Sequence, residues 1–333
     1  MITIFKNLKI NFNSKFRVMA IASLVFICCG IAFFFLKGPQ LGLEFKGGKE
    51  LIVSSNNSDK ALKSEVQKFL EKVEIKYSKI RLYGDNKVQI SIPISDNKWI
   101  KEFDEDINGD GKLDGFCSNA SFMDTDNCLN DGLTYSKLIE ISPFDVVSYT
   151  KIGATISKEI KKNATQALLI AVLLISFYII IRFDWYSVLG GVAALIHDVL
   201  IVTTFLMFFS YEFDTYIVAA FLIIIGYSLN DTIVVFDRIR ENIIEYSNMK
   251  LNEIVNFSLN ETLSRTLITS LTTLFVVVSV FIFGGESLKG SSFALIIGII
   301  SGTYSSMFIA VPISTFLRDK YYKEENEKEE QWQ

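Results

Sequence analysis

The chain has 333 residues, of which 50% are hydrophobic, and its formal net charge is −4 at pH 7. Its mean hydropathy is positive, which is outside the range of ordinary soluble proteins and predicts membrane-spanning segments. Acidic residues gather in one polar segment and at the C-terminus, so the chain has no basic footprint for nucleic acid.

Six apolar runs predict six transmembrane helices, because each is long enough to cross a hydrocarbon core of about 30 Å. Four of the runs carry no charge, namely Val18–Leu36, Ala164–Ile181, Leu267–Phe283 and Ser291–Leu317. The other two, Ser187–Phe209 and Thr215–Phe236, contain Asp198 and Asp231. We therefore expect transmembrane helix 1 at residues 18–36 and helices 2 to 6 within residues 164–317.

Basic residues in short loops predict the orientation, because Lys and Arg are retained on the cytoplasmic side. They lie before the first run (Lys6, Lys9, Lys15, Arg17), after the fourth (Arg238, Arg240, Lys250) and after the sixth (Arg318, Lys320, Lys323). We therefore expect a cytoplasmic N-terminus at residues 1–17, an acidic cytoplasmic tail at residues 318–333 and an extracytoplasmic segment at residues 37–163.

The extracytoplasmic segment has the pattern of a small α+β domain. Strand-like runs lie at Leu51–Ser54, Ile80–Tyr83 and Val88–Ile94, and the helical spacing of Leu62, Val66 and Leu70 falls between the first two. The order β–α–β–β predicts one helix packed on an antiparallel sheet. Leu138–Ile141 and Val146–Tyr149 are candidate closing strands.

A polar insertion, Phe103–Gly132, has part of a calcium-loop pattern. Its oxygen-bearing residues Asp106, Asn108, Asp110 and Asp114 occupy positions one, three, five and nine of that pattern. Position twelve, which normally supplies a bidentate carboxylate, is Cys117, so either a calcium site completed from elsewhere or a plain acidic loop fits. No other cofactor is predicted.

Two cysteines of this insertion, Cys117 and Cys128, enclose a short polar loop. Their extracytoplasmic placement is permissive for disulfides, so we expect a bridge between them.

Small residues in the last apolar run predict close helix packing. Gly298, Gly302, Ser306 and Ala310 recur every fourth residue and form a smooth strip along one helix face. In the third run, Gly190 and Ala194 share this spacing with Asp198, so the carboxylate should point into the bundle. The neighbouring His197 is the single histidine of the chain.

The fourth run turns polar at Asn230 and Asp231 before it ends. Ionisable residues at such depth usually face other helices and are typical of ion or proton pathways. Arg265 precedes the fifth run closely enough to meet Asp231 at similar depth. We therefore expect Asp231, Arg265 and Asp198 to couple proton movement, with Asn230 and His197 as supporting polar residues. Interhelical hydrogen bonding alone is the alternative for each carboxylate and for His197, and an interfacial anchor is the alternative for Arg265.

These motifs resemble the SecF family of protein-export membrane subunits, which are relatives of the RND transporters. The resemblance covers most of the chain and rests on four segments: Gly42-Leu43-Glu44-Phe45-Lys46-Gly47-Gly48, Gly226 to Thr232 followed by Phe236 to Asn242, Thr262 to Thr266, and Gly302 to Ser306. Family departures are Glu44 in place of Asp, Lys46 and Lys49 in place of small residues, Ala154 in place of Pro, and the long insertion.

The resemblance implies a multi-pass protein of the bacterial cytoplasmic (inner) membrane and not an enzyme. It implies pairing with SecD in a twelve-helix unit beside the SecYEG channel, where the proton gradient promotes outward movement of preproteins. Asp231 and Arg265 match family positions implicated in proton movement.

Two other functions are weighed against this one. An intramembrane aspartyl protease would use Asp198 and Asp231 as paired carboxylates that share a proton, but the local motif around Asp231 differs from such proteases. An RND-type efflux half-transporter would need larger outer domains. No nucleotide-binding motif is present, so energy must come from ions or from a partner.

Overall fold

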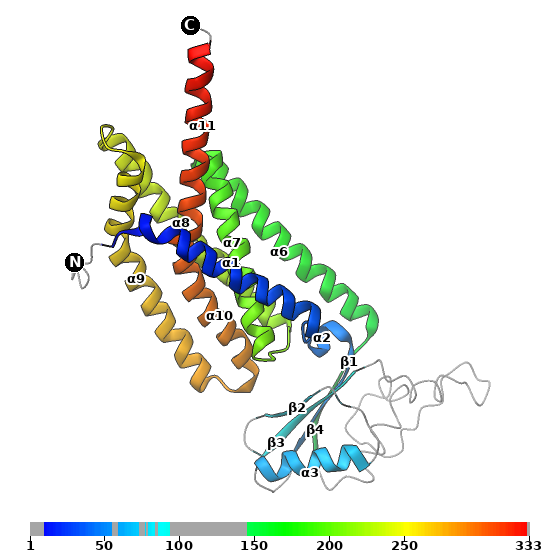
Figure 1. The fold of residues 1–333 in the computed structure, drawn as a ribbon. Coiled ribbons are helices and arrows are strands. Elements are labelled where there is room, and N and C mark those ends of the chain that lie inside the picture. The colour runs from blue at the N-terminus through cyan, green and yellow to red at the C-terminus, as the bar shows by residue number, and fades with distance from the viewer. Residues whose placement is uncertain are drawn as a thin grey trace. The chain divides into compact units, whose positions relative to one another are not determined.

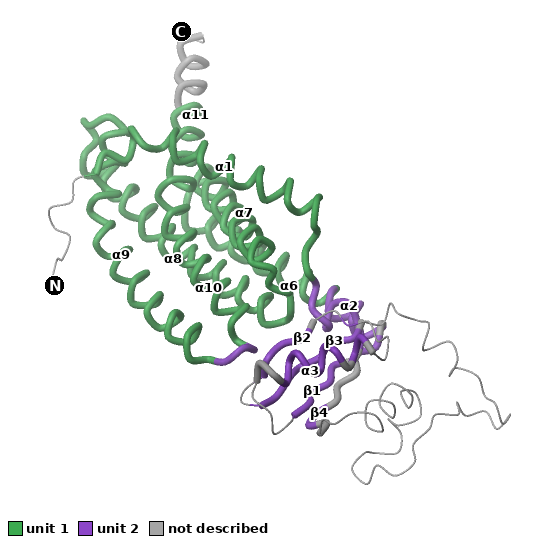
Figure 2. The backbone as a smooth tube through the Cα atoms, turned by 60° about the horizontal axis from the view of Figure 1, so that its bottom comes forward, with its two compact units in different colours: residues 1–40, 162–284, 288–333 green, residues 41–161, 285–287 purple. Residues whose placement is uncertain are grey.

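The computed structural model describes residues 10–54, 59–72, 77, 79–83, 86–93 and 145–331. The chain divides into two compact units. Figure 2 colours the first unit, residues 1–40, 162–284 and 288–333, in green and the second unit, residues 41–161 and 285–287, in purple. The first unit is helical and the second contains the sheet.

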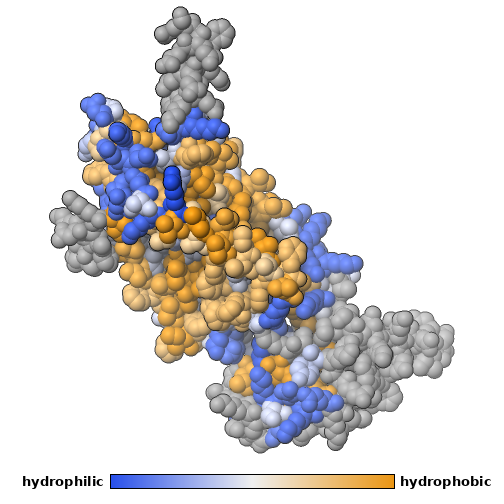
Figure 3. All heavy atoms as spheres, viewed as in Figure 1, coloured by the Kyte–Doolittle hydropathy of each residue, from blue (hydrophilic) through white to orange (hydrophobic). Residues whose placement is uncertain are grey.

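The helical unit is built from six long apolar helices, as the sequence predicts. They are α1 (Phe12–Lys37), α6 (Ala154–Arg182), α7 (Trp185–Phe208), α8 (Thr215–Glu245), α9 (Leu251–Phe283) and a last helix composed of α10 (Glu286–Ser305), a π-helical turn η1 (Ser306–Ala310) and α11 (Val311–Gln331) (Figure 1). α7, α8 and the last helix supply most of the buried residues, whereas α1, α6 and the apolar half of α9 are mostly exposed. The face of this unit seen in Figure 3 is largely hydrophobic, as lipid contact requires.

Hydrogen bonds and aromatic contacts attach α1 to the other helices along much of its length. At its N-terminus, Asn256 and Asn260 of α9 accept hydrogen bonds from the backbone N–H groups of Phe12 and Ile10, each at 2.8 Å. The bond to Asn256 satisfies the Phe12 N–H, which the start of α1 leaves without an intrahelical partner, and the bond to Asn260 holds Ile10 just before the helix. Further along, the rings of Phe26 and Phe205 stack with centroids 5.0 Å apart, which packs α1 against α7.

The last helix differs from the uninterrupted run Ser291–Leu317 that hydropathy predicts. Its π-turn Ser306–Ala310 lies directly before Pro312. Proline has no N–H to donate and its ring crowds the carbonyl group four residues earlier, here that of Phe308. A widened turn relieves this crowding.

The acidic tail is helical over most of its length, because α11 continues to Gln331. Glu and Lys are good helix formers, so a solvated helix can extend through this run.

The second unit is a four-stranded antiparallel sheet with a helix packed on it, as predicted. Its elements are a short helix α2 (Leu43–Lys46), β1 (Gly48–Ser54), α3 (Asp59–Lys72), β2 (Lys79–Leu82), β3 (Lys87–Pro93) and β4 (Asp145–Ile152). The strand order is β2-β3-β1-β4, with Leu51 opposite Ile90 on one side and Tyr149 on the other. Alternate strand residues such as Val88 and Ile90 pack against Leu62 of α3 to form the core.

Several predictions lie outside the described residues. These are the strand Leu138–Ile141, the calcium ligands Asp106, Asn108, Asp110 and Asp114, and the Cys117–Cys128 disulfide. Within the described ranges, no group of three or more His, Cys, Asp or Glu side chains is arranged to hold a metal ion.

Candidate proton-coupling site

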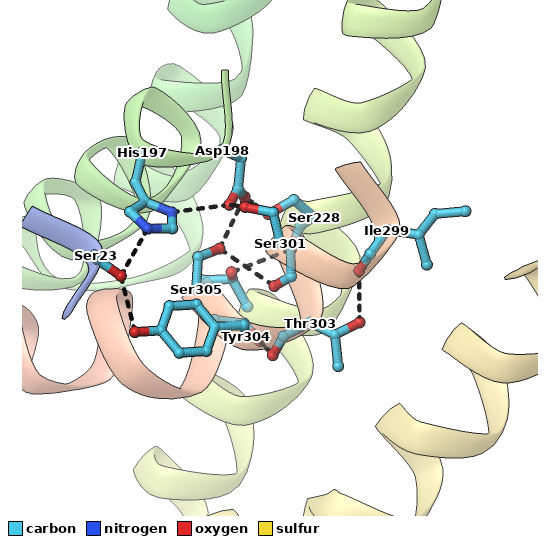
Figure 4. A network of polar contacts seen from close by, with 12 residues as sticks. Ser23, His197, Asp198, Ser228, Ile299, Ser301, Thr303, Tyr304 and Ser305 are labelled. Carbon is cyan, nitrogen blue, oxygen red and sulfur yellow. Dashed lines mark hydrogen bonds and ion pairs between the residues drawn. The ribbon is translucent and has the colours of Figure 1, made fainter. Parts of the chain in front are cut away.

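A densely bonded polar site of the helical unit surrounds Asp198 of α7, whose exposed fraction is 0%. Its Oδ1 accepts a hydrogen bond from Ser301 at 2.6 Å, and its Oδ2 accepts bonds from Ser228 at 2.6 Å and Ser305 at 2.8 Å. His197 Nδ1 lies 3.1 Å from Oδ1. Figure 4 shows these side chains converging on the carboxyl group from α7, α8 and α10.

Small residues allow the helices around Asp198 to approach this closely. At Gly302 of α10, an added Cβ would lie 2.9 Å from Ser228 Cβ, and at Gly298 it would collide with Ile224 of α8. At Gly190 of α7, it would collide with the carbonyl oxygen of Ala310 in η1. Ser306 and Ala310 are fully buried in the same π-turn. The predicted strip of small residues thus lies against α8 and α7.

The other side of His197 connects the site to α1. Its Nε2 lies 3.1 Å from Ser23 Oγ, which in turn lies 2.8 Å from the hydroxyl oxygen of Tyr304. The Tyr304 hydroxyl donates to the carbonyl oxygen of Met19 at 2.7 Å. A continuous chain of polar contacts therefore runs from α1 through α10 and α7 to α8 (Figure 4).

Asp231 of α8 is also buried, with an exposed fraction of 2%, but it has fewer partners. Ser270 of α9 is 3.4 Å from its Oδ2, the outer limit of a hydrogen bond. Ser270 Oγ is only 2.6 Å from Thr303 Oγ1 of α10, and Thr303 donates to the carbonyl oxygen of Ile299 at 2.9 Å. Because Thr303 has already donated its proton, the single hydroxyl proton of Ser270 belongs mainly to the shorter contact with Thr303. Asp231 therefore receives little hydrogen bonding.

The structure does not pair Asp231 directly with Arg265. The Arg265 side chain is exposed, and no ion pair joins these two described residues. Asn230 is exposed on α8, away from the buried face that carries Asp231.

A charged cluster joins α8 and α9 beyond the apolar part of these helices. Arg238 donates two hydrogen bonds to Glu261, at 2.7 and 2.9 Å, and a third to Glu241 at 2.8 Å. The Asn242 amide donates to Ser258 and Glu261, both at 2.9 Å. These contacts fix one end of the α8–α9 pair.

Sequence reasoning missed the hydroxyl partners of both carboxyl groups. Ser301 and Ser305 are four residues apart, and each directly precedes a member of the predicted strip, Gly302 or Ser306. This spacing could have identified a polar helix face beside the strip. Ser270 and Thr303 lie on different helices, so spacing alone could not bring them together. Asp198 and Asp231 bind different hydroxyl groups, which does not favour the proton-sharing pair of an aspartyl protease.

The fold and the site define a multi-pass membrane protein with ionisable residues inside its helix bundle, an arrangement typical of ion-driven transport. Residues 135–320 match the family model described as protein export membrane protein SecD/SecF, C-terminal. The protein translocase subunit SecF of Rhodothermus marinus is 38% identical over 321 residues, which cover 95% of both chains. SecF of Sebaldella termitidis is 35% identical over 291 residues, which cover 85% of this chain and 84% of that relative.

Solved structures agree with these relatives. SecDF of Thermus thermophilus, described as a translocon-associated membrane protein, matches with a TM-score of 0.74 and 27% identity over 95% of this chain. The present chain spans 39% of the length of that SecDF chain. The chain therefore belongs to the SecD/SecF family of protein-export membrane proteins, which confirms the resemblance seen in the sequence. Protein export, and neither enzymatic catalysis nor drug efflux, is the activity for which the family is named.

Proposed function

We propose that the chain is a SecF-like subunit that pairs with SecD and uses the proton gradient to promote preprotein translocation through the SecYEG channel. The named SecF relatives and the likeness to SecDF, of which this chain spans 39%, support a SecD-like partner. The distribution of Lys and Arg supports a location in the bacterial cytoplasmic (inner) membrane, with both termini in the cytoplasm and residues 37–163 outside.

The observation that carries the coupling role is the contrast between the two buried carboxyl groups. Asp198 accepts three hydroxyl bonds of 2.6 to 2.8 Å, whereas Asp231 has one contact of 3.4 Å. A carboxylate without donors is poorly stabilised inside a membrane protein. A protonated Asp231, in contrast, can donate to Ser270 and complete the chain of hydroxyl groups that ends at the Ile299 carbonyl oxygen.

Proton binding at Asp231 then changes the contact between α8 and α9. With the proton bound, Asp231 donates to Ser270 of α9. With the proton released, the carboxylate needs another partner, and Arg265, five residues before Ser270 on α9, carries a positive charge that can stabilise the anion. Because the Arg238–Glu261 contacts hold one end of the two helices, rearrangement at the Asp231 end gives a two-state element that a proton gradient can bias.

Two unpartnered hydroxyl groups flank this contact. Tyr227 lies four residues before Asp231 on α8, and Thr266 lies four residues before Ser270 on α9. Both hydroxyl oxygens are buried without a hydrogen-bond partner among the described residues. Such atoms can bind water, which supports a hydrated route for protons to Asp231.

The test is preprotein translocation into inverted membrane vesicles, measured with the gradient intact and collapsed at matched protein abundance. Asp231→Asn should preserve insertion and copurification of SecD in mild detergent, and it should remove the gradient-dependent part of translocation. Glu245→Gln makes the same chemical change at an exposed position of α8 and should keep normal stimulation. Equal stimulation in Asp231→Asn and wild-type vesicles would refute the coupling role.

A further inference from the structure

A pocket at one end of the helical unit has no part in the coupling role proposed above. It lies where α7 begins, beside the last turns of α8 and the first turns of α11, and it holds about 410 Å³ of empty space, part of which is open solvent. Apolar side chains such as Phe236 and Val311 form part of its lining. Its charged lining consists of Arg240, Arg318 and Asp184, which leaves one net positive charge. The pocket is therefore suited to a singly charged anion.

Two buried serines of the pocket share a hydroxyl proton that has no acceptor. Ser187 of α7 and Ser314 of α11 each have an exposed fraction of 8%, and their hydroxyl oxygens are 3.4 Å apart, the outer limit of a hydrogen bond. This contact uses at most one of the two protons, and neither hydroxyl group makes another bond to the described residues. The neighbouring Thr315, in contrast, donates to the carbonyl oxygen of Val311 at 2.8 Å, as hydroxyl groups in helices often do. A ligand with an acceptor oxygen would satisfy the remaining proton.

The two arginines present further donors to the same pocket. Arg240 is exposed and donates one hydrogen bond, to the carbonyl oxygen of Arg182 at 3.2 Å, although a guanidinium has five N–H donors. The Arg318 guanidinium lies 5.5 Å from the ring centroid of Tyr186, and the Tyr186 hydroxyl donates to Asp184 at 2.5 Å. These contacts hold Arg318 beside the start of α7. Because the planar guanidinium matches the geometry of phosphate oxygens, the pair indicates a phosphate ligand.

The start of α7 adds to this preference for an anion. The helix has 24 residues, and its N-cap residue Asp184 makes no capping bond through its side chain. The N-terminus of a helix carries a partial positive charge that favours phosphate groups.

Aromatic residues place the pocket at the level of the lipid headgroups. The exposed rings of Trp185 and Tyr321 contact each other with centroids 5.9 Å apart, and such residues gather where a membrane meets water. Phe316, which is exposed and apolar, precedes Arg318 by two residues on α11. Figure 3 shows hydrophilic residues at the end of the apolar surface from which α11 emerges. A phosphate group at this level is most readily supplied by a membrane lipid.

We propose that this pocket binds the phosphodiester group of an anionic phospholipid of the phosphatidylglycerol type. Arg240 and Arg318 bind the phosphate oxygens, as basic pockets between membrane helices bind lipid headgroups. The pair of serines donates its remaining proton to the same group. The Asp184 carboxylate repels a second negative charge, which favours a phosphodiester over inorganic phosphate with its charge of about −1.5 to −2 at pH 7. The site goes beyond the export function and does not depend on it.

Lipid binding can be measured on the full chain in mild detergent, because a ligand that binds the native state raises the midpoint of thermal unfolding. Dioctanoyl phosphatidylglycerol should raise the midpoint, and dioctanoyl phosphatidylethanolamine should raise it less. Arg240→Gln and Arg318→Gln should each weaken the apparent affinity for phosphatidylglycerol about fivefold. Arg17→Gln removes an exposed arginine of α1 outside the pocket and should bind like the wild type. Wild-type affinity in both pocket variants, or equal affinity for the two lipids, would overturn the proposal.

A double variant separates the pocket from the general attraction of basic residues to anionic lipid. Ser187→Ala combined with Ser314→Ala leaves the net charge unchanged and removes the unsatisfied proton, so without lipid it should be at least as stable as the wild type. Its affinity for phosphatidylglycerol should fall about tenfold. Wild-type affinity in this variant would show that the headgroup does not enter the pocket.

Sodium phosphate at the lipid concentrations used, with ionic strength matched, distinguishes a lipid from a free anion. It should leave the midpoint unchanged. A rise equal to that with phosphatidylglycerol would assign the pocket to a free anion and overturn the lipid site.

Discussion

Gly302→Ala should weaken the helical unit because one methyl group enters the α8–α10 contact. Its Cβ would lie 2.9 Å from Ser228 Cβ, 3.1 Å from Ser228 Oγ and 3.2 Å from Ser228 Cα. Two of these atoms belong to the Cα–Cβ bond of Ser228, so a side-chain rotation cannot relieve the clash and α8 must move away. That movement also stretches the 2.6 Å bond from Ser228 to Asp198.

The loss of stability in Gly302→Ala is the sum of three contributions. Overpacking a tight contact costs about 1 to 3 kcal/mol, and weakening the hydrogen bond from Ser228 to Asp198 adds about 0.5 to 1.5 kcal/mol. The better helix propensity of Ala returns about 1 kcal/mol. We therefore expect a net destabilisation of about 0.5 to 3.5 kcal/mol, measured as a lower midpoint of thermal unfolding in mild detergent.

Gly226→Ala is the matched control, because Gly226 lies on α8 and an added Cβ there meets nothing within 4 Å. This variant should equal or exceed the wild-type stability. If Gly302→Ala were as stable as Gly226→Ala, the close contact between α8 and α10 would be wrong, and so would the geometry of the Asp198 site that depends on it.

Two further predictions concern the ends of the helices. Glu261→Gln should lower the free energy of unfolding by at most about 1 kcal/mol, because the Arg238–Glu261 pair is partly solvated. This loss of stability should shrink as salt is added. A loss that does not depend on salt in denaturant unfolding would contradict an electrostatic origin. Asn260→Ala should free both the backbone N–H and the carbonyl oxygen of Ile10, just before α1, and should lower the stability of the helical unit by about 1 to 3 kcal/mol, as the loss of two hydrogen bonds does. Hydrogen exchange at the start of α1 should accelerate, whereas Asn248→Ala in the α8–α9 turn should leave it unchanged.

The architecture could be predicted from the sequence because its signals are local. Long apolar runs identified the six spanning helices, and the alternation of Val88, Ile90 and Ile92 identified a strand with one buried face. The π-turn at Ser306–Ala310 was not predicted, because hydropathy contains no information on backbone geometry. Pro312, two residues after this turn, was the available signal.

The site could be predicted only in part. Asp198 and Asp231 were recognisable because a carboxyl group in an apolar run is conspicuous, but the sequence does not distinguish their surroundings. That difference arises from Ser301, Ser305 and Ser270, which other helices bring to the carboxyl groups. Serine is common in membrane helices, so its presence carries little information until the helices are assembled. The structure does not show the expected contact between Asp231 and Arg265, because the Arg265 side chain is exposed whereas Asp231 is buried.

The central claim is that Asp231 binds and releases the protons that drive export. Its most direct test is proton flux into proteoliposomes that contain the chain with its SecD-like partner, followed with an internal pH dye after a gradient is imposed. The account predicts flux with wild-type and Glu245→Gln protein and none above the lipid background with Asp231→Asn. Undiminished flux through correctly folded Asp231→Asn protein would contradict it.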